Sequence, residues 1–147
     1  MERVTGIGGI FFKTADPKRL AAWYAKHLGV PVEAWGGASF NWREHARPDV
    51  EGTTVWSPFA QDTEYFGPNG ASFMVNFRVR DLEAMLGQLR RARVKVDPKV
   101  EVSEFGPFGW FTDPDGRRVE LWQPPAPRRP REAKAKAKPK ARRRKRS

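Results

Sequence analysis

The chain has 147 residues, which fit one domain, and its formal net charge of +11 is unevenly distributed. The last twenty residues hold 12 Lys and Arg against one acidic residue, whereas residues 1–127 hold 16 of each sign. The high pI therefore gives no reason to expect a basic groove on the folded part. The sequence has no cysteine, which excludes disulfides, thiolate nucleophiles and Cys-ligated zinc.

The N-terminal residues lack the apolar run of a secretory signal. No apolar segment approaches the ~20 residues of a membrane-spanning helix. We therefore expect a cytoplasmic protein with no membrane partner.

The first half of the chain predicts a strand, a helix and further short strands. Residues 8–14 form an apolar run that ends at Asp16-Pro17, a pair that favours the start of a helix. Apolar residues then recur every three or four positions up to Leu28, and Gly29 is placed to end the helix. Short β-type stretches separated by Gly, Pro and Asp turns follow at 30–32, 39–42 and 53–57.

The second half shows the same order of elements. Residues 73–79 predict a strand, Asp81 is placed as a helix N-cap, and Leu82, Met85 and Leu89 lie on one face of the next helix. Three further strands are predicted at 94–96, 108–111 and 118–122.

The two halves align at a spacing of about 65 residues. Residues 12–16 match 77–81, and 54–58 match 120–124 through a shared Trp-x-Pro. Residues 40–42 match 108–110 through a shared Phe-x-Trp. Amphipathic helices always look alike, but the repeated Trp and Pro positions are not explained in that way. We therefore predict one domain over 1–125, made of duplicated modules at 4–60 and 70–125.

Strand side chains alternate between the two faces of a sheet, so the repeat assigns a facing to each residue. One predicted face is uniformly apolar, as a face covered by helices must be: Ile10, Phe12, Val55, Val75, Phe77, Val79, Val119 and Leu121. The other face mixes aromatic, charged and amide side chains, which is typical of a cavity lining: Gly9, Phe11, Lys13, Thr54, Trp56, Met74, Asn76, Arg78, Arg118, Glu120 and Trp122.

Two long segments carry a resemblance to a known family. The run from Gly8 to Gly29 and the closing segment GPFGWFTDPDGRRVELWQP, residues 106–124, resemble the vicinal oxygen chelate superfamily of glyoxalase I, bleomycin-resistance proteins and extradiol dioxygenases. The resemblance implies an α+β fold of tandem βαβββ modules that form a curved mixed sheet around a cavity. It also implies a homodimer.

Metal-dependent members of that superfamily place His, Glu or Gln at equivalent points on the first and last strands of each module. The resemblance puts these points on Gly9, Thr54, Met74 and Glu120. Only Glu120 is a good ligand for a hard divalent ion, and catalytic sites normally use three protein ligands. We therefore expect no metal and no other cofactor.

The predicted site centres on Glu120 as a catalytic acid or base, because a carboxyl buried among aromatic rings has a raised pKa. The expected ligand-binding residues around it are Phe11, Trp42, Thr54, Trp56, Met74, Asn76, Arg78, Trp110 and Trp122.

Three functions remain open at this point. The first is metal-free binding of a small molecule of unknown identity, aromatic or cationic, as in bleomycin-resistance proteins. The second is a lyase or isomerase that uses Glu120 as acid or base or as a residual metal ligand; a dioxygenase fits less well. The third is a dimeric scaffold without ligand chemistry, in which Glu120 only pairs with Arg78 or Arg118 and the aromatic residues fill space.

The segment 126–147 is rich in Lys, Arg, Ala and Pro and offers almost nothing to bury, so we expect it to be disordered. It resembles the basic extensions of histone-H1-like proteins. Nonspecific, salt-sensitive binding to nucleic acid or another polyanion is expected, the alternative being a solvated tail without a partner. The expected polyanion-binding residues are Arg128, Arg129, Lys134, Lys136, Lys138, Lys140, Arg142, Arg143, Arg144, Lys145 and Arg146.

Overall fold

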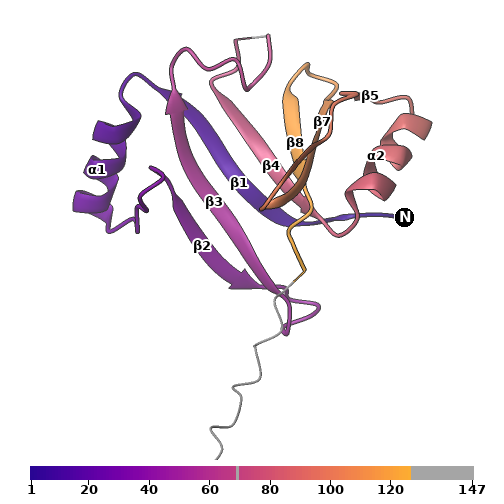
Figure 1. Cartoon of the computed structure of the whole chain (residues 1–147), viewed down its shortest axis with the longest axis horizontal. Coiled ribbons are helices and arrows are strands. Elements are labelled where there is room, and N and C mark those ends of the chain that lie inside the picture. Colours follow the sequence, from indigo (N-terminus) through magenta and orange to yellow (C-terminus); the bar gives the residue numbers. More distant parts are fainter. Residues whose placement is uncertain (69, 127–147) are drawn as a thin grey trace, which may run out of the picture.

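The structure is a computed structural model that describes residues 1–68 and 70–126. All of the predicted polyanion-binding residues lie outside the described residues. The elements in chain order are β1 (Val4–Thr14), α1 (Pro17–Leu28), β2 (Ala38–Arg43), β3 (Glu51–Ala60), β4 (Phe73–Val79), α2 (Leu82–Arg91), β5 (Lys95–Val96), β6 (Glu101–Ser103), β7 (Gly106–Thr112) and β8 (Arg118–Trp122) (Figure 1).

The strands form one mixed sheet in the order β2-β3-β1-β4-β8-β7-β5, with β6 paired to β7. Within each half the first and last strands are parallel, β1 with β3 and β4 with β8. The antiparallel pair β1–β4 joins the two halves. The strands curve around a concave face, and α1 and α2 lie at opposite ends of the sheet (Figure 1). The predicted α+β curved sheet is confirmed.

Both helices begin and pack as their sequences indicate. Asp16 Oδ1 accepts the N–H of Arg19 at 3.0 Å, and Gly29 ends α1 with a φ of 65°. In the same way Asp81 Oδ1 accepts the N–H of Ala84 at 2.9 Å and starts α2. The apolar side of α2 then packs on the sheet in a core cluster of Val79, Leu82, Met85, Leu86 and Leu121.

Two short elements differ from the prediction. Residues Val30–Val32 are not a strand, because Pro31 has no N–H for a ladder and the N–H of Val32 bonds locally to the carbonyl of Val30 at 2.8 Å. The unpredicted strand β6 instead pairs with β7, so that Val102 lies opposite Pro107.

The facing predicted for the residues of β3 is wrong. Val55 packs into the concave-face cluster, whereas Trp56 contacts Tyr24 of α1 at a ring separation of 5.0 Å and so faces the helix. The reason is the ladder register. Ser57 of β3 pairs with Phe11 of β1, just as Glu120 of β8 pairs with Asn76 of β4. The shared Trp-x-Pro therefore occupies different positions in the two ladders, and Ser57 rather than Thr54 is the counterpart of Glu120.

No helix within the described ranges 1–68 and 70–126 is long and apolar enough to cross a membrane.

Candidate functional site

Glu120 lies in the middle of β8 and is 1% exposed. The strand register places it between Asn76 on β4 and Trp110 on β7. Both neighbours are buried as well and face the same side of the sheet. The carboxyl group is therefore enclosed from two flanking strands.

Three neutral side chains donate hydrogen bonds to the Glu120 carboxylate. Asn76 Nδ2 donates to Oε1 at 2.6 Å, and Trp110 Nε1 donates to Oε2 at 2.9 Å. The hydroxyl of Tyr65 donates a short hydrogen bond to Oε2. Glu120, Asn76, Trp110 and Tyr65 are called the Glu120 network below.

The network leaves the pKa of Glu120 above its ordinary value. Burial is the largest cause, because it penalises the charged carboxylate. The hydrogen bonds from Tyr65, Asn76 and Trp110, together with the charge of Arg118, act in the opposite direction and lower the pKa in part. Burial and the nearby Glu120 carboxylate likewise raise the pKa of the Tyr65 hydroxyl. Two groups with raised pKa values thus share one hydrogen bond.

The segment between β3 and β4 supplies a part of the site that sequence reasoning missed. Tyr65 reaches Glu120, and Phe66 is 1% exposed in the concave face, where it packs with Trp110. The signal in the sequence was a pair of adjacent aromatic residues in an otherwise polar loop. These rings fill much of the expected cavity, in a cluster with Phe11, Met74, Val55, Phe59, Ala71 and Phe108.

Arg118 lies two residues before Glu120 on β8 and is held on three sides. Its guanidinium lies over the Trp110 ring at 4.6 Å. Nη1 donates to the carbonyl of Tyr65 at 2.8 Å, and Nη2 pairs with Asp97 Oδ2 at 3.2 Å. The Glu120 network therefore continues through Trp110 and Tyr65 to a fixed cation.

Arg78 and Trp42 were predicted to line the same site but belong to a separate cluster. The Arg78 guanidinium lies 5.0 Å from the Trp42 ring and 3.8 Å from the buried carboxylate of Glu44. Glu44 also pairs with Arg80 at 2.9 Å. Burial is the main cause that lowers the pKa of Arg78, while Glu44 opposes it. Thr54 belongs here too, since its hydroxyl accepts the Trp42 indole N–H at 2.8 Å.

The two remaining predicted residues differ in their surroundings. Trp122 borders the concave-face cluster, since it stacks on Phe108 at 6.0 Å, and its indole N–H donates to the carbonyl of Phe105 at 2.7 Å. Trp56 packs against α1, as described above. Of the predicted set, Phe11, Met74, Asn76, Trp110 and Glu120 are brought together.

A hollow of about 310 Å³ borders the site at Arg118. It lies between β5, β7 and the turn that follows Phe66, and it is called the Arg118 hollow below. Its lining residues are Phe66, Pro68, Lys95, Val96, Asp97, Pro98, Trp110, Phe111, Thr112, Gly116 and Arg118.

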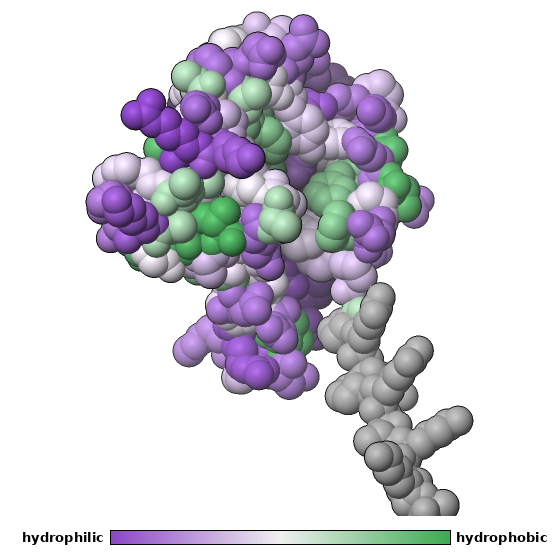
Figure 2. All heavy atoms as spheres, turned by 60° about the vertical axis from the view of Figure 1, so that its left-hand side comes forward, coloured by the Kyte–Doolittle hydropathy of each residue, from purple (hydrophilic) through white to green (hydrophobic). Residues whose placement is uncertain are grey.

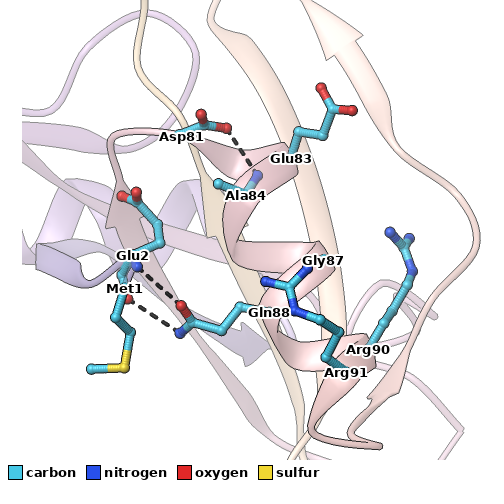
Figure 3. A pocket seen from close by; sticks show the side chains of 9 residues that line it. All are labelled: Met1, Glu2, Asp81, Glu83, Ala84, Gly87, Gln88, Arg90 and Arg91. Atoms are coloured by element: carbon cyan, nitrogen blue, oxygen red, sulfur yellow. Dashed lines mark hydrogen bonds between the residues drawn. The ribbon is translucent and has the colours of Figure 1, made fainter.

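A larger hollow of about 770 Å³ lies on the outer side of α2 and includes no residue of the Glu120 network. Figure 3 shows that the N-terminal residues lie along it: Gln88 accepts the N–H of Glu2 at 3.0 Å and donates to the Glu2 carbonyl at 3.2 Å. This hollow is an open groove between α2 and the N-terminal residues Met1 and Glu2.

The donor set of the concave face does not fit the divalent metal that the superfamily resemblance implies. Among the residues that the structure describes, no three His, Cys, Asp or Glu side chains are grouped so that they would hold an ion. The groups around Glu120 are an amide N–H, an indole N–H and a phenol, and they present protons rather than lone pairs to the carboxylate.

Comparisons with known proteins agree with this architecture. A family model of the glyoxalase-like domain matches residues 9–122. No curated protein shows a significant match.

Solved structures resemble the chain in fold. A methylmalonyl-CoA epimerase from Mycobacterium tuberculosis is 20% identical over 80% of this chain and 87% of its own, with a TM-score of 0.56. A Streptomyces coelicolor methylmalonyl-CoA epimerase variant in complex with 2-nitronate-propionyl-CoA is 16% identical over 81% and 96%, with a TM-score of 0.59.

A Legionella pneumophila protein described as an NAD-dependent benzaldehyde dehydrogenase is 16% identical over 77% of this chain and 95% of its own, with a TM-score of 0.50. Because the neighbours carry different activities, the likeness shows the fold and not a reaction. The chain has the vicinal oxygen chelate fold and belongs to the glyoxalase-like domain family.

Proposed function

We propose that the domain binds a small organic molecule on the concave face beside the Glu120 network, without a metal ion. The observation that carries this proposal is a buried carboxyl with three side-chain donors, one of which, Trp110, borders the Arg118 hollow. A carboxyl in this position is costly for stability, because burial penalises its charged form. A core residue with only a packing role would be apolar.

The aromatic walls support binding rather than a purely structural role. Trp110, a member of the Glu120 network, borders the Arg118 hollow, and so does Phe66, which packs against Trp110. A ligand in the hollow would therefore lie next to a ring whose position depends on Glu120.

Screening of a small-molecule library by thermal shift, followed by calorimetry on the hits, tests the proposal. At least one compound should raise the melting temperature in a saturable manner, and Glu120→Gln and Tyr65→Phe should weaken its binding. Glu104→Gln is the matched control, since Glu104 is exposed. A hit whose affinity is the same in all four proteins would contradict the placement of the site.

A second candidate function is a lyase or isomerase reaction with acid–base chemistry. The hydrogen bond from Tyr65 to Glu120 favours it, because it joins a half-buried tyrosine to the buried carboxyl. In such a reaction a proton leaves a carbon next to a carbonyl group and passes to Glu120 through the Tyr65 hydroxyl. The epimerases among the structural neighbours act on a substrate of that kind.

Deuterium exchange separates this candidate from simple binding. With methylmalonyl-CoA as probe in D₂O, an acid–base enzyme incorporates deuterium at the carbon between the carbonyl groups faster than the buffer does. Glu120→Gln should abolish the enhancement. If exchange at the protein's highest concentration equals that in buffer, methylmalonyl-CoA is not turned over.

We also propose that the protein is a homodimer that uses the helix-covered side of the sheet. α1 contacts Trp56 and α2 contacts Leu121, so the central pair β1–β4 lies between the helices. On this strip Ile7, Ile10 and Phe73 are 38%, 39% and 47% exposed. Figure 2 shows that hydrophobic side chains reach the surface in several patches. A second copy would cover the strip with an equally apolar surface.

The basic segment is proposed to bind nucleic acid or another polyanion on the ground of sequence charge alone. Its 12 Lys and Arg within twenty residues supply the cations that displace counterions from phosphates. The folded domain, with equal numbers of basic and acidic residues, gives no comparable attraction.

A further inference from the structure

We infer that the Arg118 hollow is a binding site for a small organic anion, such as an aromatic carboxylate. The inference rests on the proposed function and specifies the ligand class.

The charged side chains of the hollow favour an anion. Lys95 and Arg118 line it together with one acidic residue, Asp97. The Asp97 carboxylate is already engaged, since it pairs with Arg118 and its other oxygen accepts the N–H of Lys99 at 2.9 Å. These contacts lower the pKa of Asp97, with the Lys99 hydrogen bond as the largest cause. Among the described residues Lys95 forms no ion pair, so its charge is available to a ligand.

The size and borders of the hollow favour a small, compact ligand. Pro68, Pro98 and Thr112 are among its lining residues. Phe66 and Trp110 border it as well, but they are only 1% and 2% exposed and form its buried floor. A volume of about 310 Å³ is at the lower end of the ~300–1,000 Å³ range of ligand pockets, which suits a single ring and excludes a long chain.

The Arg118 guanidinium is fixed before any ligand arrives. The Trp110 ring supports it from one side, while Tyr65 and Asp97 hold two of its nitrogens. Trp110 is itself fixed by its hydrogen bond to Glu120. Little side-chain freedom is therefore lost when an anion binds. The fixed guanidinium favours anionic ligands over neutral or cationic ones.

Benzoate titrated into the full-length protein, followed by Trp fluorescence and calorimetry, tests the inference. We expect saturable binding with a Kd of roughly 0.1–10 mM, because benzoate has few atoms with which to contact the protein. The affinity should fall as salt is added. Benzylamine, which has the same ring and the opposite charge, should bind at least tenfold more weakly.

Two pairs of variants test whether benzoate binds in the Arg118 hollow. Lys95→Met should weaken benzoate binding by about three- to tenfold and Arg118→Met by more, because each removes a cation from the hollow. Lys99→Met and Arg117→Met are the matched controls and should not change the affinity, since neither residue lines the hollow. Lys95 is exposed on a short edge strand, so its variant remains informative if Arg118→Met does not fold.

The outcomes separate this inference from the proposed function. Equal binding of benzylamine and benzoate, or an equal loss in Lys95→Met and Lys99→Met, would overturn the anion site. A neutral or cationic compound whose binding requires Glu120 would overturn it as well, yet would leave the proposed function in place. If neither benzoate nor any library compound binds, both fail.

Discussion

The hydroxyl of Tyr65 donates a hydrogen bond to Oε2 of Glu120, although the two residues are 55 positions apart in the sequence. Through this contact the segment between β3 and β4 is tied to the last strand. The same segment places Phe66 in the concave face. The segment between β3 and β4 therefore covers the carboxyl group on the concave face.

The Glu120 network predicts an unusual pH dependence of stability. Burial raises the pKa of Glu120 in the native state above its ordinary value of 4.5. In the pH window between the ordinary pKa and the raised native pKa, the native state keeps a proton that the unfolded chain has released. The free energy of unfolding should therefore fall as the pH rises through this window, by at most about 1.4 kcal/mol per pH unit. Urea unfolding between pH 4 and pH 8 on wild type and Glu120→Gln measures this difference.

The Glu120→Gln protein should lack this component of the slope, because a neutral amide does not titrate. Asp97 contributes with the opposite sign, since its pKa is lowered, but it is present in both proteins and cancels. Glu104→Gln serves as the control and should follow the wild-type curve. Parallel curves for wild type and Glu120→Gln would show that the native carboxyl titrates normally.

Gly8 is predicted to be required for the position of Asn76. A Cβ at Gly8 would collide with Asn76 Oδ1 and come within 3.0 Å of the Trp122 ring. Gly8→Ala should therefore lower the free energy of unfolding by about 1–3 kcal/mol, because the buried Asn76 and the half-buried Trp122 side chains must shift. Thermal and urea unfolding measure the loss.

Gly87→Ala is the matched control and should have the opposite sign. Gly87 lies inside α2, and the nearest atom to its added Cβ is the flexible end of Arg91 at 3.4 Å. Alanine in the interior of a helix is favoured over glycine by about 0.5–1 kcal/mol. Two glycine substitutions that change stability equally would contradict the close packing at Gly8.

The proposed dimer surface predicts the effect of one charge. Ile10→Glu places a carboxylate in the centre of the exposed strip on β1, so we expect the mass in sedimentation equilibrium to fall from two chains to one. Val102→Glu is the control, since Val102 is 77% exposed on the edge strand β6. A wild-type protein that sediments as one chain of 16.8 kDa at all concentrations would refute the dimer.

The charge of the basic segment predicts a salt-dependent affinity for duplex DNA. The full-length protein should bind any sequence, with a steep loss of affinity between roughly 50 and 200 mM salt. A protein of residues 1–126 should bind far more weakly under the same conditions. Fluorescence anisotropy with a labelled duplex measures both, and equal affinities would assign the binding to the domain instead.

The sequence predicted the architecture well because helix starts, glycine ends and apolar periodicity are local properties of the chain. Asp16, Gly29 and Asp81 mark the helix boundaries that the structure shows. Glu120 was singled out from the closing motif, and the structure shows it buried on the concave face. Strand alternation also predicted the shared facing of Glu120 and Asn76.

Only the tertiary structure decided which residues surround Glu120. Trp56 turned out to face α1 because facing depends on the ladder register between β1 and β3, which the Trp-x-Pro alignment misplaced. Tyr65 and Phe66 lie in a loop without periodicity, so no local pattern indicated that they fold into the concave face. Periodicity is a property of neighbours along the chain, whereas a buried carboxyl finds its donors among residues that only the folded sheet brings together.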